Sequence, residues 1–196
     1  MVRADDPSGA GEQHGADGGS NPAEVAEVDF ESLARETCLA ALTRGPRSRA
    51  QLARALRRRG IPDEVADSVL GRLAEVGLID DAEFAAAWVE SRHRGRGLAR
   101  DALAQELRER GVANELTVAA AGRIGADEEL ATARRLVASR LAATRRLPAV
   151  ARARKLCAML ARKGYPAELA IQVVRDALTG EGVDPRELEE AGVLQP

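Results

Sequence analysis

The sequence predicts an all-α protein in which a three-helix unit of roughly fifty residues occurs three times in tandem. One observation is composition: hydrophobic residues make up 45% of the 196 residues, but aromatic residues only 2%. The core must therefore consist of leucine and valine packed against alanine, which suits helices because alanine costs least in a helix and permits close helix approach. The other observation is a glycine-centred pattern that occurs three times along the chain.

This pattern is centred on Gly60, Gly111 and Gly164, at spacings of 51 and 53 residues. Leucines stand eight and four residues before each glycine, a base directly precedes it, and an acid follows four residues later. The leucines share one helix face, the base favours the negative helix end, and glycine is the preferred left-handed cap. A helix–turn–helix element copied three times predicts a solenoid-like array.

The first 28 residues lack a periodic apolar pattern and are expected to form a disordered acidic tail. Ser48 with Gln51 forms a capping box for the second helix, and Asp80 with Glu83 forms one for the fourth. Pro62 stands where the third helix begins. Nine helices are expected near residues 30–44, 48–59, 62–76, 81–94, 98–110, 114–125, 127–143, 148–163 and 166–178.

The expected boundaries divide the helices into three units between two acidic tails. Six acids and one base follow from Asp176 to the C-terminus, so this end is expected to fray. The expected segments are the tail 1–28, repeat one at 29–94, repeat two at 95–143, a short repeat three at 144–180 with its last two helices clear, and the acidic tail 181–196.

Basic charge is concentrated between Leu130 and Ala167, where ten bases occur without one acid. Such charges would normally be interleaved with glutamate, so an anionic partner is a reasonable explanation. That partner is either single-stranded DNA or an acidic protein surface. Candidate partner-binding residues here are Arg134, Arg135, Arg140, Arg145, Arg146, Arg152, Arg154, Lys155, Arg162 and Lys163.

Two shorter basic stretches add candidates. Arg57, Arg58 and Arg59 end a helix, where solvation beside the helix dipole is the simpler interpretation. In the stretch 94–97, two glycines are expected to break the helix. The arginines at positions 92, 94, 96 and 100 then lie on a flexible connection, either solvated or bound to phosphate or carboxylate. These four candidates are Arg92, Arg94, Arg96 and Arg100.

Catalysis is not expected, because the sequence lacks a phosphate-binding loop and a nucleophile with a plausible base. No metal is expected, since no cysteine or histidine has ligand spacing, and no cofactor is expected. Cys38 and Cys157 are expected to be buried free thiols in a reducing cytoplasm. Neither a membrane-spanning run nor a secretory signal is present, and we expect a monomer.

The most distinctive stretch runs from Arg72 to Arg92. The apolar residues at 73, 76, 78 and 79 are expected to be buried at a helix end and the turn that follows it. Phe84 and Trp88 lie on one helix face, and a position in the core is the simpler interpretation for both. With the Asp80-Asp81 pair, the arginine-glycine stretch and the later Glu106-Leu107 and Arg110-Gly111-Val112, this stretch resembles the RecX family of regulatory proteins.

The resemblance implies an elongated, curved array that binds the RecA recombinase filament, with single-stranded DNA as a further partner. It implies inhibition of strand exchange, ATPase and coprotease activities in recombination and the SOS response. An alternative is a winged helix-turn-helix transcription factor over residues 48–80, although the helical pattern from Asp81 onward leaves no place for the wing. A second alternative is a structural adaptor that holds two proteins together.

Overall fold

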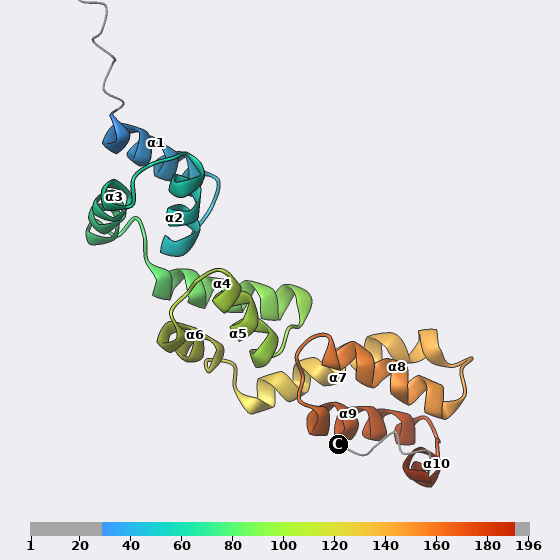
Figure 1. The fold of residues 1–196 in the computed structure, drawn as a ribbon. Helices are drawn as coiled ribbons and strands as arrows, with labels where there is room; N and C mark the ends of the chain where they lie inside the picture. Colours follow the sequence, from blue (N-terminus) through green and yellow to red (C-terminus); the bar gives the residue numbers. More distant parts are fainter. Residues whose placement is uncertain (1–28, 191–196) are drawn as a thin grey trace, which may run out of the picture.

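The protein is described by a computed structural model that covers residues 29–190, so the tail expected at 1–28 and residues 191–196 lie outside the described part. Over residues 29–190 the chain is helical, without a strand, and forms a row of helical units (Figure 1). The helices are α1 (Phe30–Thr43), α2 (Arg49–Arg58), α3 (Asp63–Glu75), α4 (Asp81–Arg96), α5 (Arg100–Glu109), α6 (Asn114–Ala121), α7 (Ala126–Thr144), α8 (Ala149–Ala161), α9 (Ala167–Gly180) and α10 (Pro185–Glu190).

The repeated glycines end α2, α5 and α8 in the left-handed conformation, with φ of 74° at Gly60, 79° at Gly111 and 82° at Gly164. At the first of these turns, the Gly60 amide donates to the Arg57 carbonyl (3.0 Å) and the Ile61 amide donates to the Leu56 carbonyl (3.2 Å). The same pair of bonds closes the other two turns. The repeated leucine and the apolar residue after glycine are thus joined in one Schellman motif.

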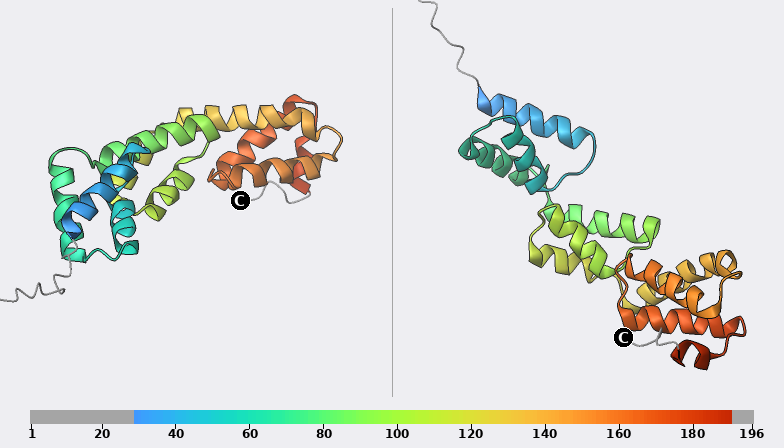
Figure 2. Two further views of the ribbon diagram at one scale, coloured as in Figure 1. Left: turned by 90° about the horizontal axis from the view of Figure 1, so that it is seen from above. Right: turned by 45° about the vertical axis from the view of Figure 1, so that its right-hand side comes forward.

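Packing divides the helices into α1–α3, α4–α6 and α7–α10, which is not the division expected from the sequence. Helix α4 was expected to close the first unit, but its Phe84, Ala85 and Val89 share a core with Leu103 and Leu107 of α5. The reason is that the apolar face of α4 meets the pair of helices that follows it. Each unit therefore consists of one helix followed by a glycine-linked pair, and the units form an elongated, curved array (Figure 2).

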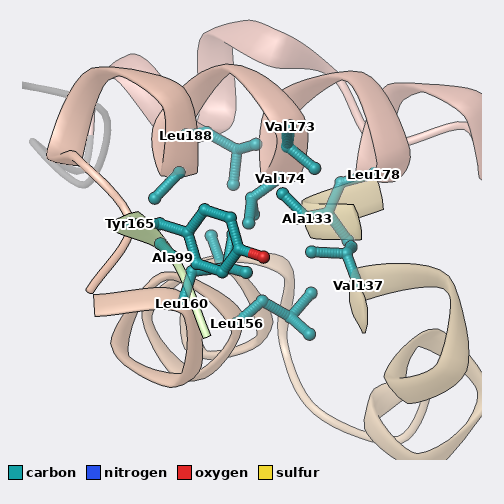
Figure 3. Close-up of a cluster of buried hydrophobic side chains, with 12 residues drawn as sticks. Ala99, Ala133, Val137, Leu156, Leu160, Tyr165, Val173, Val174, Leu178 and Leu188 are labelled. Atoms are coloured by element: carbon teal, nitrogen blue, oxygen red, sulfur yellow. The ribbon is translucent and has the colours of Figure 1, made fainter. Parts of the chain in front are cut away.

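The third unit has an additional helix. The expectation of a frayed tail from residue 181 is wrong over residues 185–190, because these residues form α10. Leu188 of this helix is fully buried and completes the core built by Leu156, Leu160 and Leu178 (Figure 3).

The stretch that carries the family resemblance is only partly buried. Phe84 is 6% exposed and stacks on the half-buried Trp88 with ring centres 5.9 Å apart, so Phe84 belongs to the core as expected. Val76 and Leu78, however, are 69% and 50% exposed, so the expectation that they are buried is wrong. Gly77 between them is left-handed, and of the four apolar residues in this stretch only Leu73 and Ile79 join the core of unit one.

Neighbouring units meet through a joint that is used twice. In the first joint, Ser48 Oγ donates to the Arg110 carbonyl (2.7 Å) and the Arg49 amide donates to the Asp81 carboxylate (2.8 Å). In the second, the amide at position 99 donates to the carbonyl at 163 (2.8 Å), and the amide at 100 donates to the carboxylate at 129 (2.9 Å). The donors are 51 residues apart, so the repeat copies the joint as well as the unit.

Candidate functional site

A groove between α1 and α2 in unit one is lined by arginine. Its floor is Leu52 with small side chains at positions 40, 41 and 55, and it encloses about 660 Å³. Glu36 is its one carboxylate, and none of its five arginines forms an ion pair within residues 29–190. These arginines are Arg44, Arg47, Arg54, Arg58 and Arg59.

Unit three has a groove of the same kind between α7 and α8. Arg140, Lys155 and Arg162 line it around Leu156 and Met159, no carboxylate lines it, and it encloses about 270 Å³. The position matches unit one, because Leu156 and Arg162 each lie 104 residues after the equivalent Leu52 and Arg58. The repeat therefore places a basic groove between the first two helices of both terminal units.

A third basic hollow of about 450 Å³ lies where the end of α4 meets α7 and the α8–α9 turn. Its bases are Arg94, Arg96, Arg135 and Lys163. Burial first, and then the charges of Arg96 and Arg140, lower the pKa of Lys163. Arg140 itself lines the groove between α7 and α8.

In unit two the corresponding space is filled by the protein itself. Trp88 lies 51 residues after Thr37, which lines the groove of unit one. The Trp88 indole donates to Glu106 (2.8 Å), and the guanidinium groups of Arg92 and Arg110 lie 4.2 and 3.6 Å from the indole ring centre. A large side chain, an acid and two stacked cations thus occupy this position in unit two.

Charge alone did not distinguish free bases from those bound within the protein. Arg57 pairs with Asp63 (2.8 Å), and Arg100 pairs with the buried Glu129 (2.9 Å). Among the other predicted residues, Arg134, Arg146 and Arg154 are exposed but line none of the three hollows. The predicted residues that line them are Arg58, Arg59, Arg94, Arg96, Arg135, Arg140, Lys155, Arg162 and Lys163. Two of these are also ion-paired, Arg94 with Glu90 (2.9 Å) and Arg96 with Glu106 (3.3 Å).

Sequence reasoning missed Arg44, Arg47 and Arg54 of the groove in unit one. A signal was available, because the stretch from Thr37 to Pro62 holds seven bases and no acid. That is the same property that identified the basic block in unit three. The bases in unit one are spread over two helices and a connection, so they do not form an obvious run.

The structure also contradicts the expectation of a flexible arginine-glycine connection. Helix α4 continues through Gly95 to Arg96 and ends at Gly97, which adopts a φ of 60°. A single glycine inside a helix costs only about 1 kcal/mol, which packing can offset. The connection after it, residues 97–99, is buried. Hydrogen bonds also hold it in place, because Tyr165 Oη donates to the Gly97 carbonyl (3.2 Å) and the Lys163 ammonium donates to the Arg96 carbonyl.

Arg145 and Arg152 were expected to face a partner, but both pair with Glu181. Arg152 is only 6% exposed, so its charge is compensated inside unit three. The ten bases have no acid within their own stretch of sequence. Their partner Glu181 lies outside that stretch, in the segment that is expected to fray. Two of the ten bases therefore leave the candidate surface.

The Glu181 pair predicts a pH dependence of stability. Hydrogen bonds from Arg152 and then from Arg145 lower the pKa of Glu181 from its ordinary value of 4.5. A lowered native-state pKa stabilises the fold above the unfolded-state pKa, and this contribution disappears as pH falls through the lowered value. We expect Glu181→Gln to destabilise the protein in urea at about pH 7 and much less at about pH 3. An equal difference at both pH values would contradict this assignment.

No group of three or more potential metal ligands occurs within residues 29–190. Over the same range, no helix is long and apolar enough to cross a membrane. Cys38 is buried and Cys157 half-buried, both are free, and burial raises the pKa of each thiol.

Tandem three-helix units joined through equivalent positions place the chain in the class of helical repeat proteins. Family models for the three domains of RecX match in order: the first three-helix domain at residues 34–73, the second at 80–120 and the third at 127–174. The chain belongs to the RecX family. The matched ranges follow the helix grouping that the packing gives.

Similar proteins support this assignment. The regulatory protein RecX of Thermobifida fusca is 56% identical over 171 residues, which cover 86% of this chain and 92% of that protein. The Streptomyces coelicolor protein of the same name is 51% identical over 181 residues, covering 90% and 96%. The crystal structure of RecX from Lactobacillus salivarius has the same fold, with a TM-score of 0.69 over 76% of this chain and 96% of that chain at 16% identity. The chain is thus a regulatory protein of the RecX type.

Proposed function

We propose that the protein binds the filament that RecA recombinase forms on DNA and restrains its strand-exchange, ATPase and coprotease activities. It would act in the cytoplasm, in homologous recombination, DNA repair and the SOS response. The observation that supports this proposal best is the pair of equivalent basic grooves at the two ends of one curved array. An extended repeating ligand that contacts both grooves would be held at two points.

The two grooves would act together. Each arginine can form charge-assisted, bidentate hydrogen bonds to phosphate or carboxylate oxygens. Because one chain carries both grooves, binding at one end raises the effective concentration at the other, so two weak contacts give a tight complex. A protein that spans neighbouring filament subunits in this way blocks access to the strand between them.

The composition of the grooves favours contacts with phosphate rather than with bases. Neither groove has an aromatic residue in its lining, so neither offers a stacking surface for bases. Phosphate contacts position a protein on nucleic acid without reading sequence. A transcription factor with a β-hairpin wing is not supported, since residues 29–190 contain no strand.

The direct test is co-sedimentation with recombinase filaments on single-stranded DNA, together with ATPase and strand-exchange assays. We expect the protein to sediment with the filament at low salt and to inhibit both activities. If about four phosphates are neutralised, affinity should fall roughly fiftyfold between about 50 and 200 mM salt. Failure to co-sediment at low salt would refute the proposal.

A further inference from the structure

The positive charge of the arginines in the groove of unit one exceeds the negative charge of the carboxylates beside them. Five arginines face one carboxylate, Glu36, and no ion pair within residues 29–190 involves any of these six side chains. Of the five arginines, Arg54 has a hydrogen bond, to the Arg110 carbonyl of unit two (3.3 Å). Mutual repulsion of such a cluster is relieved when an anionic group binds between its members.

A segment with the opposite charge is attached to the same unit. Residues 1–28 contain six acids and one base, and the chain enters α1 directly after Asp29. The groove lies along the second half of α1, from Glu36 to Arg44, about 20 Å or less from the helix start at 1.5 Å per residue. A 28-residue segment can reach roughly 90 Å when extended, so the groove is well within range.

We propose that the acidic segment 1–28 binds the arginine groove of unit one in its own chain and competes there with external polyanions. The tether gives the segment an effective concentration of about a millimolar, enough for a weak electrostatic contact to be populated. The groove of unit three stays free for the partner. The competition, but not the contact itself, rests on the function proposed above.

The contact can be tested in the full-length protein without DNA or recombinase. We suggest a variant in which the six acids become amides: Asp5→Asn, Asp6→Asn, Glu12→Gln, Asp17→Asn, Glu24→Gln and Glu27→Gln. Backbone amide NMR spectra of this variant and the parent should differ at low salt along α1 and α2. The difference should disappear at about 0.5 M salt, where the Debye length is only a few ångströms.

A matched control neutralises three exposed acids at the other end of the molecule, Glu187→Gln, Glu189→Gln and Glu190→Gln in α10. This control should leave the α1 and α2 amides unchanged. Identical spectra for the parent and the neutral-segment variant would overturn the proposal. So would changes confined to α7 and α8, or changes that grow with protein concentration, because the latter would mean contact with a second copy.

The competition is tested with inorganic polyphosphate as the probe. At low salt the neutral-segment variant should bind polyphosphate about fivefold more tightly than the parent, since the tethered competitor is gone. Adding Arg54→Gln and Arg58→Gln should abolish this gain. An unchanged affinity alongside the expected NMR difference would overturn the competition while leaving the contact and the proposed function intact.

Discussion

Replacing Gly164 with alanine should destabilise the protein by about 3 kcal/mol, because the change combines two penalties. Gly164 has a φ of 82°, which strains any other residue by about 1 kcal/mol. The added Cβ would also lie 2.6 Å from both the Cβ and the backbone nitrogen of Ala102, across the joint between units two and three. Overpacking of this kind typically costs a further 1–3 kcal/mol.

Urea unfolding measures this effect, and Gly60→Ala is the matched control. Gly60 ends α2 with nearly the same φ of 74°, but no atom lies within 4 Å of the position of its added Cβ. The control should therefore show only the conformational penalty of about 1 kcal/mol. Gly111→Ala should resemble Gly164→Ala, because its Cβ would lie 2.4 Å from the Ala50 Cβ at the first joint. Equal losses at all three glycines would show that the joints are not tightly packed.

Replacing Arg58 and Arg162 together with glutamine should weaken binding to the recombinase filament by about a hundredfold. Each substitution alone should cost about tenfold, since a hydrogen bond to a charged group contributes roughly 1.5–3 kcal/mol. The two residues occupy equivalent positions in the grooves of units one and three. Each lost phosphate contact should also reduce the slope of log affinity against log salt by about one.

Fluorescence anisotropy with labelled single-stranded DNA in the filament measures these affinities. The matched control is Arg57→Gln, since Arg57 is adjacent to Arg58 in sequence but is held by Asp63 at 2.8 Å. We expect it to change affinity less than about twofold, because exposed ion pairs contribute little and this arginine lines neither groove. A loss as large as that of Arg58→Gln would indicate general charge attraction rather than a groove.

The sequence predicts the turns of this fold well, because their causes are local. Gly60 and its two counterparts adopt the left-handed conformation expected from the leucine–base–glycine spacing. The sequence predicts the grouping of helices poorly, because tertiary packing decides whether α4 belongs to the unit before it or to the unit after it. The acidic composition of residues 185–190 likewise conceals Leu188, whose burial decides that α10 forms.

The sequence predicts only some of the bases that line the hollows, again because tertiary packing decides the rest. Arg58 and Arg162 were found from runs of charge, but the runs also included Arg152, whose partner Glu181 is 29 residues away. Which bases remain free depends on contacts between helices, which spacing along the chain does not reveal. Arg44, Arg47 and Arg54 gather in one groove only when α1 and α2 pack side by side.

Equivalent positions bond across both joints: Ser48 Oγ and the Ala99 amide donate to turn carbonyls, and the Arg49 and Arg100 amides donate to carboxylates. Units repeated through equivalent joints form a short piece of a superhelix. A helical polymer of compatible pitch would meet the equivalent side chains of units one and three in the same orientation. The length of polymer that a single protein covers is then set by the joints, so stiffening or loosening a joint would alter that footprint without touching a basic residue.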